Sequence, residues 1–252
     1  GDAPAEAAAA KLEAEEEAEA EEPAPGPGPP QLLGQWQQLQ GVPRPEGGVG
    51  ARFLAWTGDG HVASHREQGR FEVHFAAEDR QAQRVTDNIG LNMAAVSPTA
   101  ACLAAGAGAG GGSQMIIRPA ERWDKAVFSA ALGSADEAVE AVACGATFAA
   151  ALTSKRVLRV YGLSGLPLGI VSVAGRSVAL AARHGHLLAV TGAPGAGDAP
   201  PPEGQDDALQ YRLLDVRTRT QRAAGRLPLS PGSRLRWLGL SAELAPVAVD
   251  TL

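Results

Sequence analysis

Short apolar or alternating segments, separated by turn residues, fill the chain from Arg52 onward. In residues 69–75, aromatic and aliphatic side chains alternate with polar ones, which is the period of a strand with one buried face. Such segments recur at the close, regular spacing that is typical of an all-β sandwich, barrel or propeller. The other segments are residues 52–56, 61–67, 91–97, 100–105, 114–118, 138–144, 147–154, 156–163, 168–175, 176–182, 186–191, 208–216, 234–241 and 245–250.

The length of this strand-rich part favours a propeller. A four-stranded blade takes about 40–45 residues, so the ~200 residues from Arg52 correspond to four or five blades. No segment carries the apolar stripe of an amphipathic helix, and the last strand-like run stops at the end of the chain. We therefore expect residues 51–252 to form an incomplete, divergent WD-repeat-like β-propeller.

The N-terminal segment, residues 1–50, has a different composition. The chain has 22 Lys and Arg against 28 Asp and Glu, and residues 1–22 alone hold nine of the acids and one base. The rest of the chain is therefore nearly neutral. Five prolines follow between residues 23 and 30, and residues 31–50 remain rich in Gly and Pro. We expect residues 1–50 to be a disordered acidic, Pro/Gly-rich linker, either a solvated spacer or a tail that engages basic proteins such as histones.

Several motifs that resemble catalytic or ligand sites lack the context that their chemistry needs. Gly106, Gly108 and Gly111 satisfy GxGxxG, but a strand-like segment follows where phosphate binding needs a helix N-terminus. Cys102 and Cys144 are far apart in the sequence and lack zinc spacing, which suits a reducing compartment. No nucleophile is paired with a base, and no apolar run is long enough for a membrane helix. We expect no enzyme activity, no cofactor, no metal and no membrane span.

A basic cluster near the C-terminus is the strongest candidate for a contact surface. Seven arginines fall between positions 212 and 236, opposed in that stretch only by Asp215, and such a cluster could grip a phosphate backbone. The alternative is the solvated face of a β-hairpin. The candidate partner or DNA contacts are Arg212, Arg217, Arg219, Arg222, Arg226, Arg234, Arg236 and the adjacent Trp237. A tryptophan in an alternating segment such as residues 234–241 is more often a core strand residue, which is the alternative for Trp237.

The dipeptide Trp123-Asp124 is the signature that names WD repeats. Its expected Gly-His partner is missing from the same repeat, since Gly60-His61 lies farther upstream than the length of one repeat. Any propeller in this chain is therefore a divergent one.

Three longer segments, residues 52–62, 138–190 and 209–250, carry a family resemblance. Together they make the chain from Arg52 to Leu252 similar to the central, SepB-like propeller of the acidic nucleoplasmic DNA-binding proteins. This family of replisome adaptors includes the WD-repeat and HMG-box DNA-binding protein and the yeast chromosome transmission fidelity adaptor. The resemblance covers about four fifths of the chain.

The resemblance implies a nuclear, non-enzymatic scaffold of the replication fork that forms a homotrimer through this propeller. Family members bind the replicative helicase assembly (GINS) and DNA polymerase alpha–primase through a helical domain that follows the propeller. We expect that domain, the N-terminal WD-repeat propeller and any HMG box to lie outside this chain. The alternative function is a DNA-binding module that uses the basic cluster Arg212–Arg236, with chromatin as its target.

Overall fold

The computed structural model describes residues 52–77, 81–106, 113–124, 128–132, 136–195, 197, 200–202 and 205–251. The linker predicted for residues 1–50 lies outside this part of the chain, as do Gly108 and Gly111 of the glycine motif.

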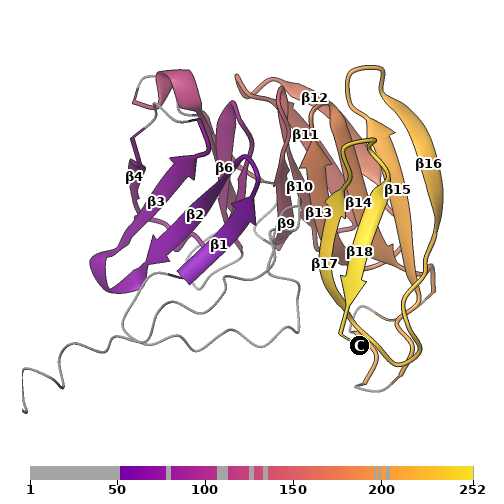
Figure 1. Cartoon of the computed structure of the whole chain (residues 1–252). Coiled ribbons are helices and arrows are strands. Elements are labelled where there is room, and N and C mark those ends of the chain that lie inside the picture. The colour runs from indigo at the N-terminus through magenta and orange to yellow at the C-terminus, as the bar shows by residue number, and fades with distance from the viewer. Residues whose placement is uncertain are drawn as a thin grey trace, which may run out of the picture. The chain divides into compact units, whose positions relative to one another are not determined.

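In the described residues, eighteen strands form five antiparallel sheets, and within each sheet the strands pair in chain order (Figure 1). Blade 1 contains β1 (Arg52–Thr57), β2 (Gly60–His65), β3 (Arg70–Phe75) and β4 (Gln83–Thr86). Blade 2 contains β5 (Met93–Val96), β6 (Ala100–Ala105), β7 (Gln114–Pro119) and β8 (Phe128–Ala131). Blade 3 contains β9 (Val139–Cys144), β10 (Phe148–Thr153), β11 (Val157–Gly162) and β12 (Pro167–Ser172). Blade 4 contains β13 (Ser177–Arg183), β14 (His186–Gly192), β15 (Leu209–Asp215) and β16 (Thr220–Leu227), and blade 5 contains β17 (Leu235–Leu240) and β18 (Pro246–Asp250).

Four hydrophobic clusters join the blades in chain order. The first lies between blades 1 and 2, the second between blades 2 and 3, the third between blades 3 and 4, and the last between blades 4 and 5. The first strands of successive blades, β1, β5, β9, β13 and β17, contact one another in turn. Antiparallel four-stranded sheets stacked in series in this way are the blades of a propeller. The prediction of an all-β propeller of four to five blades is confirmed.

Small side chains let the sheets approach closely. Every residue of β6 and of β10 is buried, and alanine supplies four of the six residues in β6 and three of the six in β10. Alanine is a strong helix former, but these alanines lie between two sheets, where burial outweighs intrinsic propensity.

Polar contacts between hairpin turns also connect the blades. Thr99 donates from Oγ1 to the carbonyl oxygen of Ala146 at 2.6 Å, and the backbone N–H of Ala146 donates to the carbonyl oxygen of His184 at 2.8 Å. Farther along, Ser177 donates from Oγ to the carbonyl oxygen of Thr153 at 2.9 Å. These bonds satisfy backbone groups at the ends of strands in blades 3 and 4.

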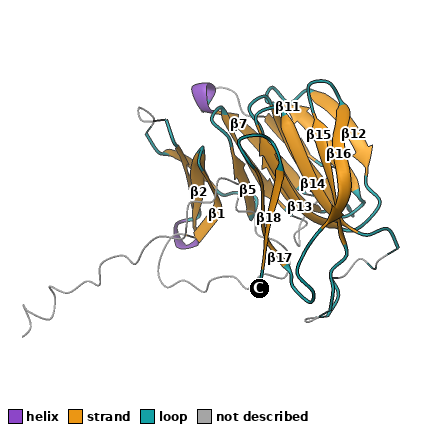
Figure 2. Cartoon of the chain, turned by 45° about the vertical axis from the view of Figure 1, so that its right-hand side comes forward, coloured by secondary structure: helices purple, strands orange, loops and turns teal. Residues whose placement is uncertain are grey.

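The helical content of the described residues is two single 3-10 turns, η1 (Arg66–Gln68) and η2 (Ala120–Arg122), as Figure 2 shows. No helix in this part of the chain is long and apolar enough to span a membrane. Gly106 is followed, beyond the undescribed residues, by β7, which pairs antiparallel with β6. The glycine motif therefore connects two strands of a hairpin, as its sequence context indicated.

Candidate interaction surface

The β15–β16 hairpin carries five of the seven predicted arginines. Arg217 and Arg219 lie exposed in the turn, and Arg219 adopts φ +57° there. On β16, the outermost strand of blade 4, Arg222 and Arg226 are exposed, whereas Arg212 on β15 is half-buried.

Asp215 fixes the turn of this hairpin. Its Oδ1 accepts a hydrogen bond from the backbone N–H of Thr218 at 3.1 Å. The pKa of Asp215 is lowered, first by that bond and also by the nearby His186, so its carboxylate is ionised at neutral pH. Four exposed guanidinium groups thus share the hairpin with one carboxylate that serves the backbone, and the hairpin has a net positive charge.

The remaining three candidates belong to blade 5 and differ from one another. Arg236 is exposed on β17. Arg234 lies with its Nη1 3.8 Å from Oδ2 of Asp207 and also donates to the carbonyl oxygen of Pro201. Trp237 is 3% exposed, which fits the alternative of a core strand residue.

Asp207 is a partner of Arg234 that the spacing of residues in the sequence does not reveal. Arg176 donates from Nη2 to both of its carboxylate oxygens at 2.6 Å, and both side chains are 9% exposed. Arg176 and Arg234 are distant in sequence from Asp207, so their convergence depends on the packing of blade 4. Arg234 is therefore held within the protein by a carboxylate that it shares with Arg176 and by the carbonyl oxygen of Pro201. The exposed arginines of the hairpin are the stronger candidates for contact.

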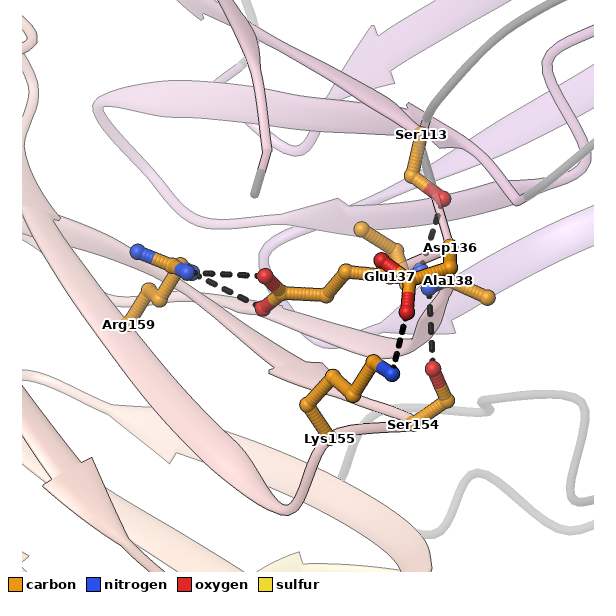
Figure 3. Close-up of polar contacts among 8 residues, drawn as sticks. Ser113, Asp136, Glu137, Ala138, Ser154, Lys155 and Arg159 are labelled. Atoms are coloured by element: carbon orange, nitrogen blue, oxygen red, sulfur yellow. Dashed lines mark hydrogen bonds and ion pairs between the residues drawn. The ribbon is translucent and has the colours of Figure 1, made fainter. Parts of the chain in front are cut away.

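A second polar cluster joins blade 2 to blade 3 (Figure 3). Arg159 on β11 donates to both carboxylate oxygens of Glu137, from Nε at 3.0 Å and from Nη2 at 2.9 Å. Glu137 is 4% exposed, and its hydrogen bond raises the pKa of Arg159. Beside it, Ser113 accepts at Oγ from the backbone N–H of Val139 at 2.8 Å. Each of these groups is satisfied within the protein, so the cluster serves the structure of the blades.

Blade 1 carries a further surface, which the sequence pattern alone does not reveal. Phe53 is 49% exposed and Trp56 41% exposed, with their ring centroids 4.7 Å apart. Trp56 stacks on His61 at 5.5 Å, and His61 stacks on His74 at 4.4 Å. We call these four residues the aromatic–histidine ladder.

Strand register brings the ladder together, since Trp56 pairs with His61 and His61 pairs with His74 across β1, β2 and β3. The sequence alone does not reveal this ladder, because cross-strand neighbours are not adjacent in sequence. Burial and the neighbouring His74 lower the pKa of His61, so its ring is neutral at pH 7. No group of three side chains able to hold a metal ion occurs among the residues with described positions.

Known proteins are similar to this chain in sequence. The chain is 30% identical to the protein ENHANCER OF LHP1 1 of Arabidopsis thaliana over 208 residues, which are 81% of this chain and 21% of that protein. It is 26% identical to WD repeat and HMG-box DNA-binding protein 1 of Homo sapiens over 205 residues, 79% of this chain and 18% of that protein. The chain thus spans about a fifth of the length of these relatives.

A solved structure of Hsv2 from Kluyveromyces lactis is 10% identical and matches with a TM-score of 0.48, covering 79% of this chain and 57% of that one. This likeness is too distant to support an argument. The family model described as minichromosome loss protein Mcl1, middle region, matches residues 38–252. This match and the WD-repeat relatives confirm the resemblance inferred from the sequence. The chain belongs to the family of the middle region of the minichromosome loss protein Mcl1.

Proposed function

We propose that this chain is the propeller of a non-enzymatic scaffold of the DNA replication fork, located in the nucleus. The family match over residues 38–252 is the observation that carries the proposal. The human relative's name adds DNA binding and an HMG box. The fold agrees with a scaffold, because a propeller presents many loops on rigid strands and binding needs no acid–base pair.

The finer proposal is that the propeller forms a homotrimeric hub, and that the whole protein links the replicative helicase, through GINS, to DNA polymerase alpha–primase. In such a hub each protomer contributes one partner site, so that three partners are held at high effective concentration.

Co-precipitation of the tagged full-length protein, with and without residues 38–252, tests this proposal. The intact protein should recover differently tagged copies of itself, and also GINS and DNA polymerase alpha–primase. The deleted protein should lose self-association and the simultaneous recovery of both partners. If self-association and joint recovery survive the deletion, the hub proposal is wrong.

A direct DNA-binding module is the second candidate function, favoured by the four exposed arginines of the β15–β16 hairpin. Each phosphate that such a site neutralises releases counterions, so affinity for duplex DNA should fall steeply as salt rises. The binding should survive removal of residues 1–30.

Two variants test this second candidate: one removes positive charge from the β15–β16 hairpin, and the control removes it elsewhere on the surface. Replacing Arg217, Arg219, Arg222 and Arg226 with Gln should abolish binding, while Arg122→Gln, an exposed arginine in η2 of blade 2, should leave it unchanged. Absence of binding by the unmodified chain at low salt would exclude this function.

A further inference from the structure

The fourth strand of a blade is paired on one side only. In the described residues these edge strands are β4, β8, β12 and β16, each at the end of its four-stranded sheet. Their outward N–H and C=O groups have no partner in the sheet, and proteins guard such edges with charged side chains or keep them very short. Arg222 and Arg226 are exposed along β16, and β4 and β8 are only four residues long. These three edges are therefore guarded.

The edge of β12 lacks these guards. The strand is six residues long, and no charged residue occurs in the sequence from position 160 to position 175. Leu166, directly before the strand, is 64% exposed, and Ile170 within it is 65% exposed. Pro167 takes only the first position, where the rest of the edge keeps its N–H groups. The edge is therefore apolar, uncharged and open.

This exposure does not come from an open end of the series of blades. The other large apolar side chains exposed in the described residues, Phe53, Trp56 and Val247, belong to blades 1 and 5, which are the two ends of the series. Blade 3 packs against a four-stranded blade on each side, through one hydrophobic cluster with blade 2 and another with blade 4. Further blades that close the ring would leave β12 exposed.

Contacts on both sides hold β12 in place. The strand pairs with β11, and its register shifts only near its start. Leu168 and Val171 pack on the hydrophobic cluster shared with blade 4. The turn before the strand lies against blade 2, since a Cβ atom on Gly165 would be 2.0 Å from the ring of Phe128. A strand held in this way is pre-organised, which reduces the entropy lost when a partner binds.

The middle of the edge is open to another backbone and offers it no free charge. A Cβ atom added to Gly169 would meet nothing within 4 Å, so a second chain can approach closely there. Ile170 pairs across the sheet with Arg159. The guanidinium group of Arg159 is already held by both carboxylate oxygens of Glu137. The edge therefore suits a partner segment without charge.

We propose that β12 is a docking site for an extended, uncharged segment of a partner protein, which adds to blade 3 as a fifth strand. Main-chain hydrogen bonds to the free edge hold the segment, and its apolar side chains at alternate positions pack on Leu166 and Ile170. A helix cannot pair with the edge, because its own backbone groups are bonded internally. Nucleic acid or an acidic peptide finds no cation on this strand.

Fluorescence anisotropy with a labelled peptide tests the proposal. The probe is Thr-Val-Thr-Val-Thr-Val, acetylated and amidated so that its ends carry no charge. Two further forms are N-methylated, one at the odd positions and one at the even positions. Alternate N–H groups of an added strand point toward the edge, so one methylated form should bind at least tenfold more weakly than the probe and the other should bind as the probe does.

Variants of the chain locate the site. Ile170→Lys places a charged guard on β12 and should weaken binding of the probe at least tenfold. The matched control is Ala224→Lys, which adds the same charge to β16 between Arg222 and Arg226 and should bind the probe as the unmodified chain does. The thermal midpoint of each variant establishes that it is folded. In the unmodified chain, the probe should slow hydrogen exchange in β12 and leave β16 unchanged.

Three outcomes would overturn the proposal: no binding of the probe by the unmodified chain, equal binding of the two methylated forms, or equal binding by Ile170→Lys. Sedimentation of the chain without the probe completes the test. Self-association that Ile170→Lys abolishes would assign the edge to a second copy of this chain, and would overturn its assignment to a partner protein. None of these measurements depends on the proposed replication function.

Discussion

The two cysteines are buried thiols of the blade core. Cys102 is fully buried and Cys144 is 1% exposed, and both are free. The Sγ atom of Cys144 lies 3.4 Å from the carbonyl oxygen of Ala100 and 3.5 Å from Oγ of Ser97. Burial raises the pKa of Cys144 to about 12 and that of Cys102 well above its usual value. Neither side chain therefore supplies a reactive thiolate at neutral pH.

Because these thiols are buried, we expect the protein to lose stability at alkaline pH. A thiol in the unfolded chain titrates at about pH 8.5, whereas the two thiols of the folded protein keep their protons to much higher pH. Below that value both states are protonated and stability is unaffected. Above it only the unfolded state releases protons, so the free energy of unfolding falls, by about 1–2 kcal/mol per thiol between pH 8 and pH 10.

Urea unfolding at several pH values measures this slope. The double variant Cys102→Ala, Cys144→Ala is the control, and it should lose less stability over the same interval. Equal slopes for the two proteins would contradict the prediction.

The buried pair of Glu137 and Arg159 predicts a second effect. Arg159→Met leaves the Glu137 carboxylate buried without its two hydrogen bonds from Arg159, and should reduce the free energy of unfolding by about 2–4 kcal/mol. The matched control is Lys155→Ala, which removes a partner of Asp136 at an exposed position. The control should leave the urea midpoint unchanged, since exposed ion pairs contribute little. An equal shift of the urea midpoint in both variants would show that burial of the Glu137 carboxylate does not cause the loss of stability.

At the residue scale, the sequence identified charges but not their partners. The concentration of arginines between positions 212 and 236 was evident, because all of them lie within one stretch of chain. Asp207 as the partner of Arg234, and His61 stacked between Trp56 and His74, were not evident. The first contact depends on how the segments that precede β15 and β17 pack together. The second depends on strand register, which is set by the fold as a whole.

At the scale of elements, the sequence identified inner strands more readily than outer ones. The apolar runs predicted the inner strands that are buried by the neighbouring blades, such as β6 and β10, and the predicted ends of these strands match closely. They did not predict β4, β8 and β16, each the last strand of its blade. Most residues of β16 are exposed, so its sequence lacks the alternation that marks a half-buried strand.

Gly175, between β12 and β13, marks a close approach of two backbone segments. A Cβ atom at this position would lie 1.8 Å from the carbonyl oxygen of Gly192 at the end of β14. Gly175→Ala must therefore displace the backbone, and should destabilise the protein by about 1–3 kcal/mol, as overpacking does.

Gly169→Ala is the control for Gly175, because a Cβ atom added there on β12 meets nothing within 4 Å. Replacing glycine in a strand reduces the entropy of the unfolded chain, so Gly169→Ala should be neutral or slightly stabilising. Differential scanning calorimetry compares the two. A melting temperature for Gly175→Ala at or above that of Gly169→Ala would contradict the close approach.

At the scale of the whole molecule, the blades are held in series. In the described residues, blades 2, 3 and 4 each contribute to two hydrophobic clusters, whereas blades 1 and 5 each contribute to one. The number of blades was predictable from the length and the strand spacing. The order of contacts was predictable as well, because antiparallel strands that follow one another in the chain pair as neighbours.

Serial packing predicts unequal protection from hydrogen exchange along the chain. The comparison is between β2 and β10, each of which is hydrogen-bonded to a strand on both sides within its sheet. They differ in their neighbours, because β10 lies in a blade packed on both faces and β2 in a blade with one open face. Local opening requires fewer buried contacts to be broken in blade 1, so the amides of β2 should exchange at least about tenfold faster than those of β10.

Hydrogen-exchange mass spectrometry of the unmodified chain measures this difference, with β14 of blade 4 as a second strand packed on both faces. The expected order is slow exchange in β10 and β14 and faster exchange in β2. Equal protection in all three strands would mean that the blades open as one cooperative unit and that a single packed face stabilises blade 1 as well as two.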